Sequence, residues 1–418
     1  VPIAAVAMGA AVIEKHITVD RGMEGNDHKV SLLPDEFAQM MQGIRRVEES
    51  MGQGGERSIS QGEMMNREVL AKSLVAACDV PAGTEITEAM VRIQSPGQGL
   101  QPNRLKDLVG RRLPVAKAQG DVFFPSDLET PAATPRSYSF NQPFGLPVRY
   151  HDIQLFSKVS NLDLVEIHLS YKDLEVDLNK VLPNRQGMGL VVHAPELFAG
   201  DHTLDLCTDD ESYRHHSIKE LQRVIDISRD LRNRFNCPDP VLLVTNVGGF
   251  SEHHHLSRAE REPLRSRLIA SLEKLSSSGE VEIIPQTMPP FPWHFGGQRF
   301  HNLFVDSDFI RQFCVDQGMR VCLDVSHSKL ACNHLHLPFR QFLDQILPHT
   351  AHLHLADAKD VDGEGLQIED GDIDWVQLFQ QINQHCPKAS FIPEIWQGHK
   401  NGGEGAWLAL ERLEAAAA

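Results

Sequence analysis

The stretch VCLDVSHSKLA, residues 321–331, decides how most of this sequence is interpreted. It opens with an apolar run that ends on Asp324, and His327 follows three residues later. A short apolar run bounded by polar residues is typical of a buried strand. Asp324 and His327 would then lie at or just beyond the carboxyl end of that strand, where barrel enzymes place their functional groups.

The same pattern recurs twice further along the chain. HLHLADAKD, residues 352–360, contains His354 and Asp357, and FIPEIW, residues 391–396, contains Glu394. The three runs are roughly thirty to forty residues apart, the length of a strand plus a crossover helix, which predicts neighbouring parallel strands. Carboxylates and imidazoles that meet at the carboxyl ends of such strands are typical of metal-assisted barrel enzymes.

Eight strand-like runs can be counted in residues 141–418, and amphipathic stretches separate them. Strand alternating with helix eight times predicts an α/β fold, a (β/α)8 TIM barrel. The runs are GLPVRY (145–150), LDLVEIHL (162–169), MGLVVHA (188–194), PVLLVTN (240–246), EVEIIPQT (280–287), GMRVCLDV (318–325), TAHLHLA (350–356) and SFIPEI (390–395).

Composition narrows the class of protein and its partners. The 418 residues are too many for a single hydrophobic core, so more than one domain is expected. Residues 131–418 hold 26 Lys and Arg against 39 Asp and Glu, which disfavours a nucleic-acid partner. Seven scattered cysteines without a CxxC pair indicate a reduced, cytoplasmic protein. No apolar stretch is long enough for a membrane span, so no membrane partner is expected.

The first 140 residues are patterned differently from the barrel. AVIEKHITV, residues 11–19, predicts a strand, and residues 32–52 predict a helix with one apolar face. One strand and one helix cannot bury both of their faces, so we expect a piece of something larger. Residues 67–129 alternate short strands with frequent turn signals, which predicts a small β-rich domain. Residues 130–140, rich in Pro, Ser, Thr and Ala, predict a linker.

EKHITVDRGMEGNDHKVSLLPDEF, residues 14–37, resembles the last strand, loop and helix of the sialic acid (N-acetylneuraminate) synthase barrel. The module at 67–129 resembles the SAF, or antifreeze-like, domain that follows that barrel. The resemblance implies that residues 1–62 are the C-terminal remnant of a synthase TIM barrel and that His16 is a metal ligand. It also implies condensation of phosphoenolpyruvate with an N-acetylmannosamine-type sugar, an activity expected to be incomplete here, and a homodimer.

Residues 141–418 resemble the xylose isomerase-like TIM barrel superfamily through VVHAPE, an Asn-Val-Gly-Gly turn, DVSH, HLHLAD and PE, in that order. Isomerases of that group hold a divalent metal with Glu, Asp, His and Glu. The resemblance assigns three of these ligands to Asp324, His354 and Glu394. The fourth position carries Gln286, a neutral oxygen donor that would bind a metal more weakly. Such a set suits Mn, Mg, Co or Zn, and no nucleotide cofactor is expected.

Further candidate residues surround these ligands. Glu394 would be ligand and base together, and His193 and His327 match histidines next to substrate or metal in the superfamily. Glu166 and His168 should face the barrel interior if Val165 and Ile167 face the helices. His352, one layer deeper than His354, is expected to be structural. The residues predicted to contact substrate are Glu166, His168, Asp357 and Trp293.

The function expected from these features is isomerisation or epimerisation of a sugar, amino sugar or sugar phosphate. Next to a synthase-like segment, it suggests a bifunctional protein of nonulosonic (sialic-type) acid biosynthesis. One alternative is a non-catalytic barrel that binds a sugar or serves as a scaffold, which Gln286 favours. Another is an endonuclease IV-like phosphodiesterase, but Thr245 and Asn246 end the fourth strand where that branch has a metal histidine.

Overall fold

The structure, a computed structural model, describes residues 1–52, 59, 61–129, 133–182, 186–235, 237, 240–291, 293–294 and 297–418. Of residues 61, 293–294 and 297–298 only the backbone is described. The chain divides into two compact units, Val1–Ile59 and Ser60–Ala418, each treated by itself below. None of the described helices combines the length and the apolar character that crossing a membrane requires.

The first unit contains helix α1 (Pro2–Ala7), the 3-10 turn η1 (Asp27–Val30) and helix α2 (Pro34–Met51). Helix α2 confirms the helix expected from the apolar periodicity. The strand expected at residues 11–19 is wrong: the only bridge found there joins Ile17 to Leu32. A strand is held by hydrogen bonds to neighbouring strands, and the described residues of this unit offer this segment no such neighbour.

The second unit begins with helix α3 (Gln61–Leu70) and the small β-rich domain predicted at 67–129. Strands β1 (Ser73–Ala76) and β2 (Val91–Gln94) pair in antiparallel fashion. RRLPVA (111–116) and DVFFP (121–125), which also have the pattern of short strands, make isolated bridges instead. The remaining elements are η2 (Glu88–Met90), η3 (Pro102–Arg104), α4 (Leu105–Leu108) and η4 (Pro125–Asp127), and the buried core is Leu74, Ala76, Val80, Ile86, Leu100, Leu108, Leu113 and Phe123.

All eight strands predicted for the barrel are present. Five pair in parallel in the order β10-β8-β5-β4-β3, and three in the order β14-β15-β18. Parallel bridges from Phe144 to Phe391 and from Gln286 to Cys322 join the two sets and close the barrel. The strands are β3 (Gly145–Val148), β4 (Leu164–His168), β5 (Gly189–His193), β8 (Val241–Thr245), β10 (Val281–Pro285), β14 (Val321–Asp324), β15 (Thr350–Leu355) and β18 (Ser390–Pro393).

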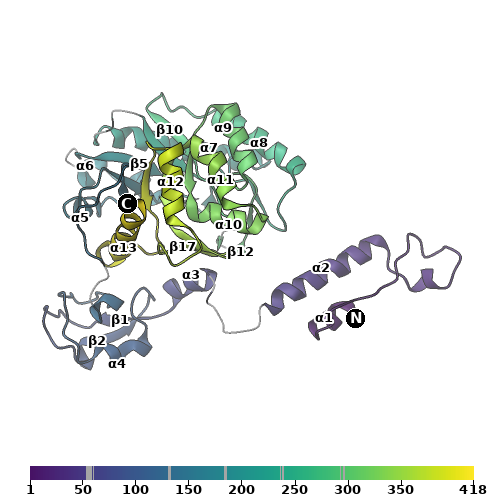
Figure 1. Ribbon diagram of the computed structural model, residues 1–418, viewed down its shortest axis with the longest axis horizontal. Helices are drawn as coiled ribbons and strands as arrows, with labels where there is room; N and C mark the ends of the chain where they lie inside the picture. Colours follow the sequence, from purple (N-terminus) through teal and green to yellow (C-terminus); the bar gives the residue numbers. More distant parts are fainter. Residues whose placement is uncertain are drawn as a thin grey trace. The chain divides into compact units, whose positions relative to one another are not determined.

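Helices surround the strands, as Figure 1 shows for α7 to α13. They are α5 (Ile153–Phe156), α6 (Leu178–Val181), α7 (Glu211–Arg232), α8 (Arg258–Leu272), α9 (Ser307–Gln317), α10 (Val325–Leu335), α11 (Phe339–Ile346), α12 (Trp375–His385) and α13 (Lys400–Ala417). Short elements complete the loops: η5 (Tyr171–Glu175), η6 (Leu347–His349), β6 (Leu197–Phe198), β7 (His202–Thr203), β9 (Phe250–Ser251), β11 (Trp293–His294), β12 (Gly297–Gln298), β13 (Phe300–His301), β16 (Asp357–Lys359) and β17 (Gly363–Leu366).

The alternation of side chains along the strands builds the site. An apolar layer fills the barrel interior, while Val165 and Ile167 belong to the core between strands and helices, as expected. Because alternate residues share one face of a strand, the residue two positions after each interior apolar residue also points inward. The pairs are Leu164 and Glu166, Val191 and His193, Ile284 and Gln286, Cys322 and Asp324, and Ile392 and Glu394.

Strand β15 reaches the same layer through an irregular register. Val321 pairs with Thr350, but the next residue, Cys322, pairs with His352, so Ala351 is left without a counterpart on β14. One extra residue changes which side chains face inward beyond it. The shift allows the side chains of both His352 and His354 to contact other side chains in the barrel interior.

Candidate metal centre

Three predicted ligands converge at the carboxyl ends of β14, β15 and β18. Nδ1 of His354 lies 2.6 Å from Oε2 of Glu394 and 3.6 Å from Oδ2 of Asp324. One ligand atom from each of the three residues lies within 4.8 Å of the others. His354 is fully buried and Asp324 nearly so, whereas the side chain of Glu394 remains 31% exposed. The group is therefore accessible from one side, through Glu394.

Asp324 is held by the helix that follows it. It is the N-cap of α10, and its Oδ1 accepts a hydrogen bond of 2.8 Å from the backbone N–H of His327. Thr287 fixes the backbone on the other side, since its hydroxyl accepts from the N–H of Asp324 at 2.9 Å. With Oδ1 engaged in the cap, Oδ2 is the oxygen that faces His354.

Gln286 joins this group through its amide. Its Nε2 donates to Oδ2 of Asp324 at 3.1 Å and lies 3.1 Å from Nδ1 of His354, while its Oε1 lies 3.2 Å from Nε2 of His193. The sequence predicts an oxygen donor at this position, whereas the amide nitrogen faces the ligands here. Oxygen and nitrogen exchange places when the amide turns about its last bond.

His193 favours the turned amide. Its Nδ1 lies 2.8 Å from the carbonyl oxygen of Ala194, to which it donates. Burial lowers the pKa of His193 to about 4, so the ring is neutral at pH 7. A neutral ring that donates at Nδ1 can only accept at Nε2. The partner that this nitrogen requires is the amide N–H of Gln286, which would leave the amide oxygen facing Asp324 and His354.

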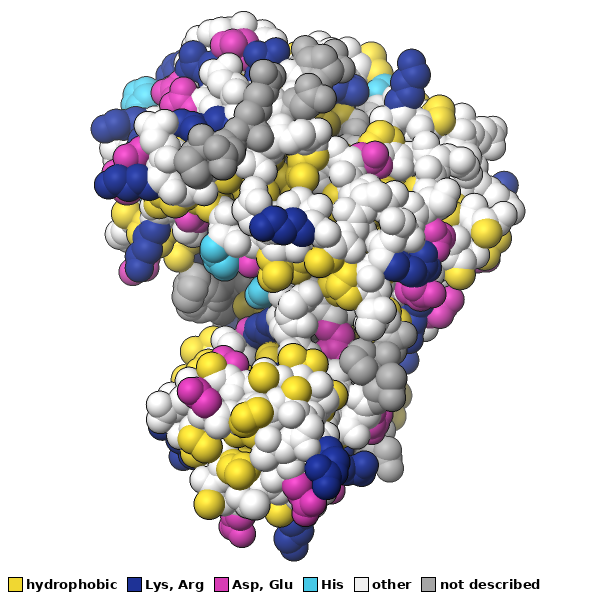
Figure 2. Space-filling view, turned by 90° about the vertical axis from the view of Figure 1, so that its left-hand side faces the viewer, with side chains coloured by type: hydrophobic (Ala, Val, Ile, Leu, Met, Phe, Trp, Pro, Cys, Tyr) yellow, Lys and Arg dark blue, Asp and Glu magenta, His cyan; other side chains and the backbone are white. Residues whose placement is uncertain are grey.

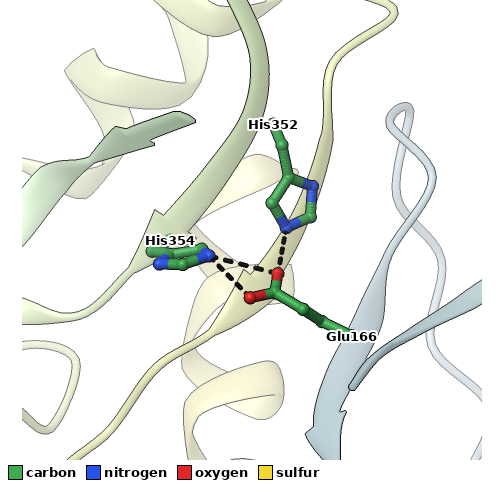
Figure 3. A group of neighbouring side chains, drawn as sticks. All are labelled: Glu166, His352 and His354. Atoms are coloured by element: carbon green, nitrogen blue, oxygen red, sulfur yellow. Dashed lines mark hydrogen bonds and ion pairs between the residues drawn. The ribbon is translucent and has the colours of Figure 1, made fainter. Parts of the chain in front are cut away.

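The opposite nitrogen of His354 is held by Glu166 (Figure 3). Nε2 lies 3.1 Å from both Oε1 and Oε2 of Glu166, and all three residues drawn in the figure are fully buried. Nε2 of His352 donates to Oε2 at 2.7 Å, and Ser390 holds Nδ1 of His352 at 2.7 Å. His352 therefore has the structural place that was expected for it. Because Nε2 of His354 donates to a carboxylate, its Nδ1 is the nitrogen left for a ligand.

The charges at this point call for a cation. Burial would raise the pKa of Glu166, but His354, together with His168 and His352, lowers it well below its usual range. Burial would likewise lower the pKa of His354, and the anionic groups around it, Glu166 and Glu394 among them, raise it well above its usual value. Ionised carboxylates in a buried place need positive charge nearby, which protonated His354 supplies here and a metal ion on Nδ1 would supply in its place.

A divalent metal fits this donor set. Asp324 and Glu394 supply carboxylate oxygens, His354 supplies a nitrogen, and Gln286 supplies an amide oxygen when it turns. Oxygen donors with one imidazole suit Mn, Mg, Co or Zn. A second group of converging atoms belongs to Glu166, His352 and His354. These atoms are already engaged in the hydrogen bonds above, so we assign this group the structural role of holding His354 in place.

Asp324, Glu394 and Gln286 line a cavity of about 570 Å³ at the carboxyl ends of the barrel strands. Such a volume accommodates a small molecule such as a sugar. Carboxylates and histidines from several loops line it, and Arg149 is the only Lys or Arg among the described lining residues. The ionisable lining residues are Glu68, Arg149, His168, His193, Glu196, Asp324, His327, Glu364, Glu394 and His399.

His327 and His168 both line the cavity. Nδ1 of His327 donates to the carbonyl oxygen of Thr287 at 3.0 Å, and its Nε2 lies 3.2 Å from Oε1 of Glu364. Burial would lower the pKa of His327, but Asp324 and Glu364 raise it to about 10. Nε2 of His168 lies 3.0 Å from Oε1 of Glu166 and its Nδ1 lies 3.9 Å from Oε1 of Glu394.

Glu196 and Glu364 are site residues that sequence reasoning missed. Glu196 lies in the loop after β5, and Glu364 lies in the short strand β17. At neither place does a strand periodicity in the sequence mark which side chains face the cavity. Partial removal of water raises the pKa of Glu196, although its side chain remains exposed. The only available signal was its position directly after His193-Ala194-Pro195, at the end of a predicted strand.

Asp357 and His16 do not line the cavity, and the side chain of Trp293 is not described. Asp357 is fully buried and is not among the residues lining the cavity: its carboxylate accepts from the N–H groups of Ala358, Ile373 and Glu369 and from the indole of Trp375. These hydrogen bonds compensate the negative charge of the Asp357 carboxylate, so no substrate is needed to do so. The side chain of Trp293 lies outside the part of the chain that the structure describes. His16, in the first unit, is exposed and belongs to neither group of converging ligands found among the described residues.

Comparison with known families matches three segments of the chain. Residues 154–415 match the xylose isomerase-like TIM barrel family. Residues 1–56 match the NeuB family, and residues 71–129 match the SAF domain. The two resemblances inferred from the motifs are thus confirmed, as is the α/β fold with a TIM barrel and a SAF domain.

Sequence relatives of the N-terminal part include synthases of N,N'-diacetyllegionaminic acid, N-acetylneuraminate 9-phosphate and pseudaminic acid. The N,N'-diacetyllegionaminic acid synthase of Campylobacter jejuni is 38% identical over 111 residues, 27% of this chain and 33% of that protein. The human N-acetylneuraminate-9-phosphate synthase is 37% identical over 124 residues, 29% and 34% respectively. The chain spans about a third of the length of these relatives.

Solved structures similar to the barrel include sugar epimerases. A D-tagatose 3-epimerase-like protein superposes with a TM-score of 0.48 at 17% identity, over 66% of this chain and 98% of that one. The 3-keto-D-glucoside 4-epimerase of E. coli superposes with a TM-score of 0.46 at 14% identity, over 66% of this chain and 99% of that one.

Proposed function

The chain belongs to the xylose isomerase-like TIM barrel family, and on that premise we propose that its barrel isomerises or epimerises a sugar with the help of one divalent metal ion. The observation that carries the proposal is the convergence of Asp324, His354 and Glu394, with Nδ1 of His354 turned toward the two carboxylates. The barrel lacks a second set of ligands among its described residues apart from the Glu166 group, so one ion is proposed.

When bound, the ion would polarise a carbonyl and a neighbouring hydroxyl of the sugar and so acidify the C–H bond next to the carbonyl. Glu394 is placed to take that proton. Its Oε2 contacts His354, whereas Oε1 is turned toward His168 on the cavity wall. In an isomerisation, Glu394 would return the proton to the former carbonyl carbon while the hydroxyl proton passes to the former carbonyl oxygen. In an epimerisation, a second acid would instead deliver a proton to the opposite face of the original carbon, and Glu394 would release its proton to solvent.

His193 and His327, predicted as catalytic, act through their neighbours in this proposal. Both ring nitrogens of each have protein partners in the structure. His193 orients the amide of Gln286, and His327 brings positive charge to Glu364 at the edge of the cavity. His168, partly exposed beside Glu394, is the histidine proposed to contact substrate together with Glu196.

The charges of the cavity indicate a substrate without phosphate. Carboxylates outnumber the single guanidinium among the described lining residues, and the guanidinium of Arg149 is already engaged by the carbonyl oxygen of His168 and by Asp173. Carboxylates accept hydrogen bonds from sugar hydroxyl and amino groups and repel phosphate. A neutral sugar or an amino sugar is therefore the substrate class proposed.

The wider biological role is a proposal by association. Proximity in one chain to a segment similar to sialic acid synthases suggests a bifunctional protein that makes or processes the amino sugar of a nonulosonic acid, as a cytoplasmic homodimer. The domain boundaries proposed are 1–62, 67–129 and 141–418, joined by a linker. Residues 130–132 of that linker lie outside the described residues.

Two other functions are less well supported. Gln286 favours a non-catalytic sugar-binding barrel, because its amide brings no charge to the ligand group. An endonuclease-like activity would need further metal histidines and a basic groove. The fourth strand ends with Thr245 and Asn246, whose Oδ1 accepts from Gly248, and in the described part of the surface in Figure 2 basic and acidic side chains are interspersed.

The test is metal binding followed by hydrogen exchange with solvent. Chelator-treated full-length protein is titrated with Mn²⁺, and the loaded protein is incubated in D2O with free ketohexoses and N-acetylhexosamines. We expect about one ion per chain and deuterium at a carbon next to the carbonyl of at least one sugar. Asp324→Asn should abolish both, whereas Glu273→Gln, on the surface beyond α8, should change neither. If no metal binds, the non-catalytic sugar-binding function becomes the better supported of the two.

A further inference from the structure

Helix α3 and the SAF domain lie against the loop that carries Glu394. Glu68, in the last turns of α3, forms an ion pair with Lys400, the first residue of α13. Both side chains are largely buried, with exposed fractions of 20% and 13%. Lys400 follows Glu394 by only six residues, so the ion pair ties α3 to the segment that bears the proposed base.

A second set of bonds joins the two domains. The hydroxyl of Ser126, in η4 of the SAF domain, donates to Oε2 of Glu404 at 2.9 Å and accepts from Nδ2 of Asn401 at 2.8 Å. Asn401 adopts a left-handed backbone conformation, with φ of 50°, at the start of α13. Two independent contacts therefore fix the SAF domain to the same turn of the barrel.

The end of α3 is itself fixed to the SAF domain through Gly97. The N–H of Gly97 donates to the carbonyl oxygen of Glu68 at 2.9 Å. A Cβ at this position would lie 2.3 Å from the carbonyl oxygen of Arg67 and 2.8 Å from Cβ of Ala71, so only glycine permits the approach. Glu68 is thus held from both sides, by the SAF domain behind it and by Lys400 in front.

Glu68 also lines the 570 Å³ cavity that contains Glu394 and His327. It is the only described lining residue from outside the barrel, and it lies between this cavity and a second one of about 460 Å³ that separates the SAF domain from α13. A largely buried carboxylate at the edge of a sugar-sized cavity is suited to accept hydrogen bonds from hydroxyl or ammonium groups.

We propose that α3 and the SAF domain form one wall of the barrel cavity, and that Glu68, positioned by Lys400, is a specificity-determining residue that binds a hydroxyl or amino group of the sugar. The SAF domain then serves the barrel of its own chain. The binding role of Glu68 rests on the proposed sugar chemistry, whereas the docking of the SAF domain does not.

Docking is tested by hydrogen–deuterium exchange of the full-length protein, read by mass spectrometry at residues 62–70 and 395–401. Glu68→Lys and Lys400→Glu each place like charges together, and we expect amide exchange in both segments to become at least threefold faster. The double variant with the two charges exchanged should return toward the wild-type rates. Arg104→Asp, which breaks an exposed ion pair with Asp107 inside the SAF domain, is the matched control and should change neither segment. Unchanged exchange in the two single variants would overturn the docking.

Binding is tested with the isosteric variant Glu68→Gln and whichever sugar exchanges deuterium in the presence of Mn²⁺. We expect KM to rise about tenfold with kcat within a factor of two, because a charge-assisted hydrogen bond is lost while Glu394 stays in place. An unchanged KM would overturn the binding role. If no sugar in the panel exchanges deuterium, the proposed function fails, while the exchange rates at 62–70 and 395–401 still decide the docking.

Discussion

The carboxylate of Glu166 binds Nε2 of His354, with each of its oxygens 3.1 Å from that nitrogen. This interaction determines which nitrogen of His354 faces Asp324 and Glu394. In metal sites such outer carboxylates orient the imidazole and raise its basicity, and their loss costs about ten- to a hundredfold in metal affinity.

We therefore expect Glu166→Gln to weaken Mn²⁺ binding by about ten- to a hundredfold, measured by calorimetric titration. The variant should also lower the free energy of unfolding by about 1–3 kcal/mol, because buried His352 and His354 lose a charged partner. Glu220→Gln is the control, since Glu220 is a buried carboxylate paired with Arg223 on α7, outside the barrel interior. Unaltered metal affinity in Glu166→Gln would show that His354 is oriented by other means.

Restoring a carboxylate at Gln286 gives the opposite prediction. Gln286→Glu adds a third carboxylate to the ligand group, next to Asp324, and should tighten Mn²⁺ binding at least tenfold. Without metal the same variant should unfold more easily than the wild type, because an unpaired buried carboxylate is costly. Thermal unfolding with and without Mn²⁺ measures both effects. If added Mn²⁺ stabilises the variant no more than the wild type, Gln286 does not belong to the metal site.

Phosphorylated sugars should be poor ligands. Because Glu196, Glu364 and Glu394 face the cavity, we expect a free ketohexose to compete at least tenfold better than its phosphate ester. The measurement is competition against deuterium exchange of the sugar that reacts. Removing two negative charges from the cavity in the double variant Glu196→Gln/Glu364→Gln should reduce the difference in competition between the free ketohexose and its phosphate ester. A preference of the wild-type protein for the phosphate ester would contradict the substrate class proposed.

His255 predicts a pH dependence of stability away from the metal centre. Burial, together with the charges of His334 and Arg261, lowers the pKa of His255 to about 4. The folded state thus binds a proton less readily than the unfolded state, whose histidine pKa is about 6.5. The stability linked to His255 is therefore complete above pH 6.5 and is lost as the pH falls toward 4.

The variant that isolates this effect is His255→Phe, which keeps a ring packed against Phe300 and His334. Between pH 7 and pH 4.5 its melting temperature should fall less steeply than that of the wild type. A second variant, His253→Phe, alters an exposed neighbour and should follow the wild-type curve. Parallel curves for wild type and His255→Phe would refute the assignment.

Strand periodicity carried most of the successful sequence predictions. All eight barrel strands were expected, and period-two alternation placed Glu166 inside because Val165 had to face the helices. Asp324, His354 and Glu394 were singled out because each ends or follows an apolar run. The information behind these predictions is the spacing of apolar and polar residues along the chain, and a single sequence contains that spacing in full.

Other features depend on partners that a single sequence does not reveal. Asp357 follows a strand just as Asp324 does, yet its oxygens are taken by the N–H groups of its own loop. Residues 11–19 have the composition of a strand but find only Leu32 to pair with. Glu68 lies more than three hundred residues from Glu394 in sequence, and nothing in its local pattern places it at the cavity.

The double engagement of Asp324 has a consequence for how this protein can evolve. One oxygen caps helix α10 and the other faces His354, so a replacement that caps poorly, such as alanine, removes the charge from the centre and also loosens the start of a helix. Asparagine, which caps a helix as well as aspartate and has nearly the same shape, removes the charge and keeps the cap. A lineage that abandoned the chemistry yet kept the barrel would therefore be expected to show asparagine here, which makes this position a marker of lost activity among relatives.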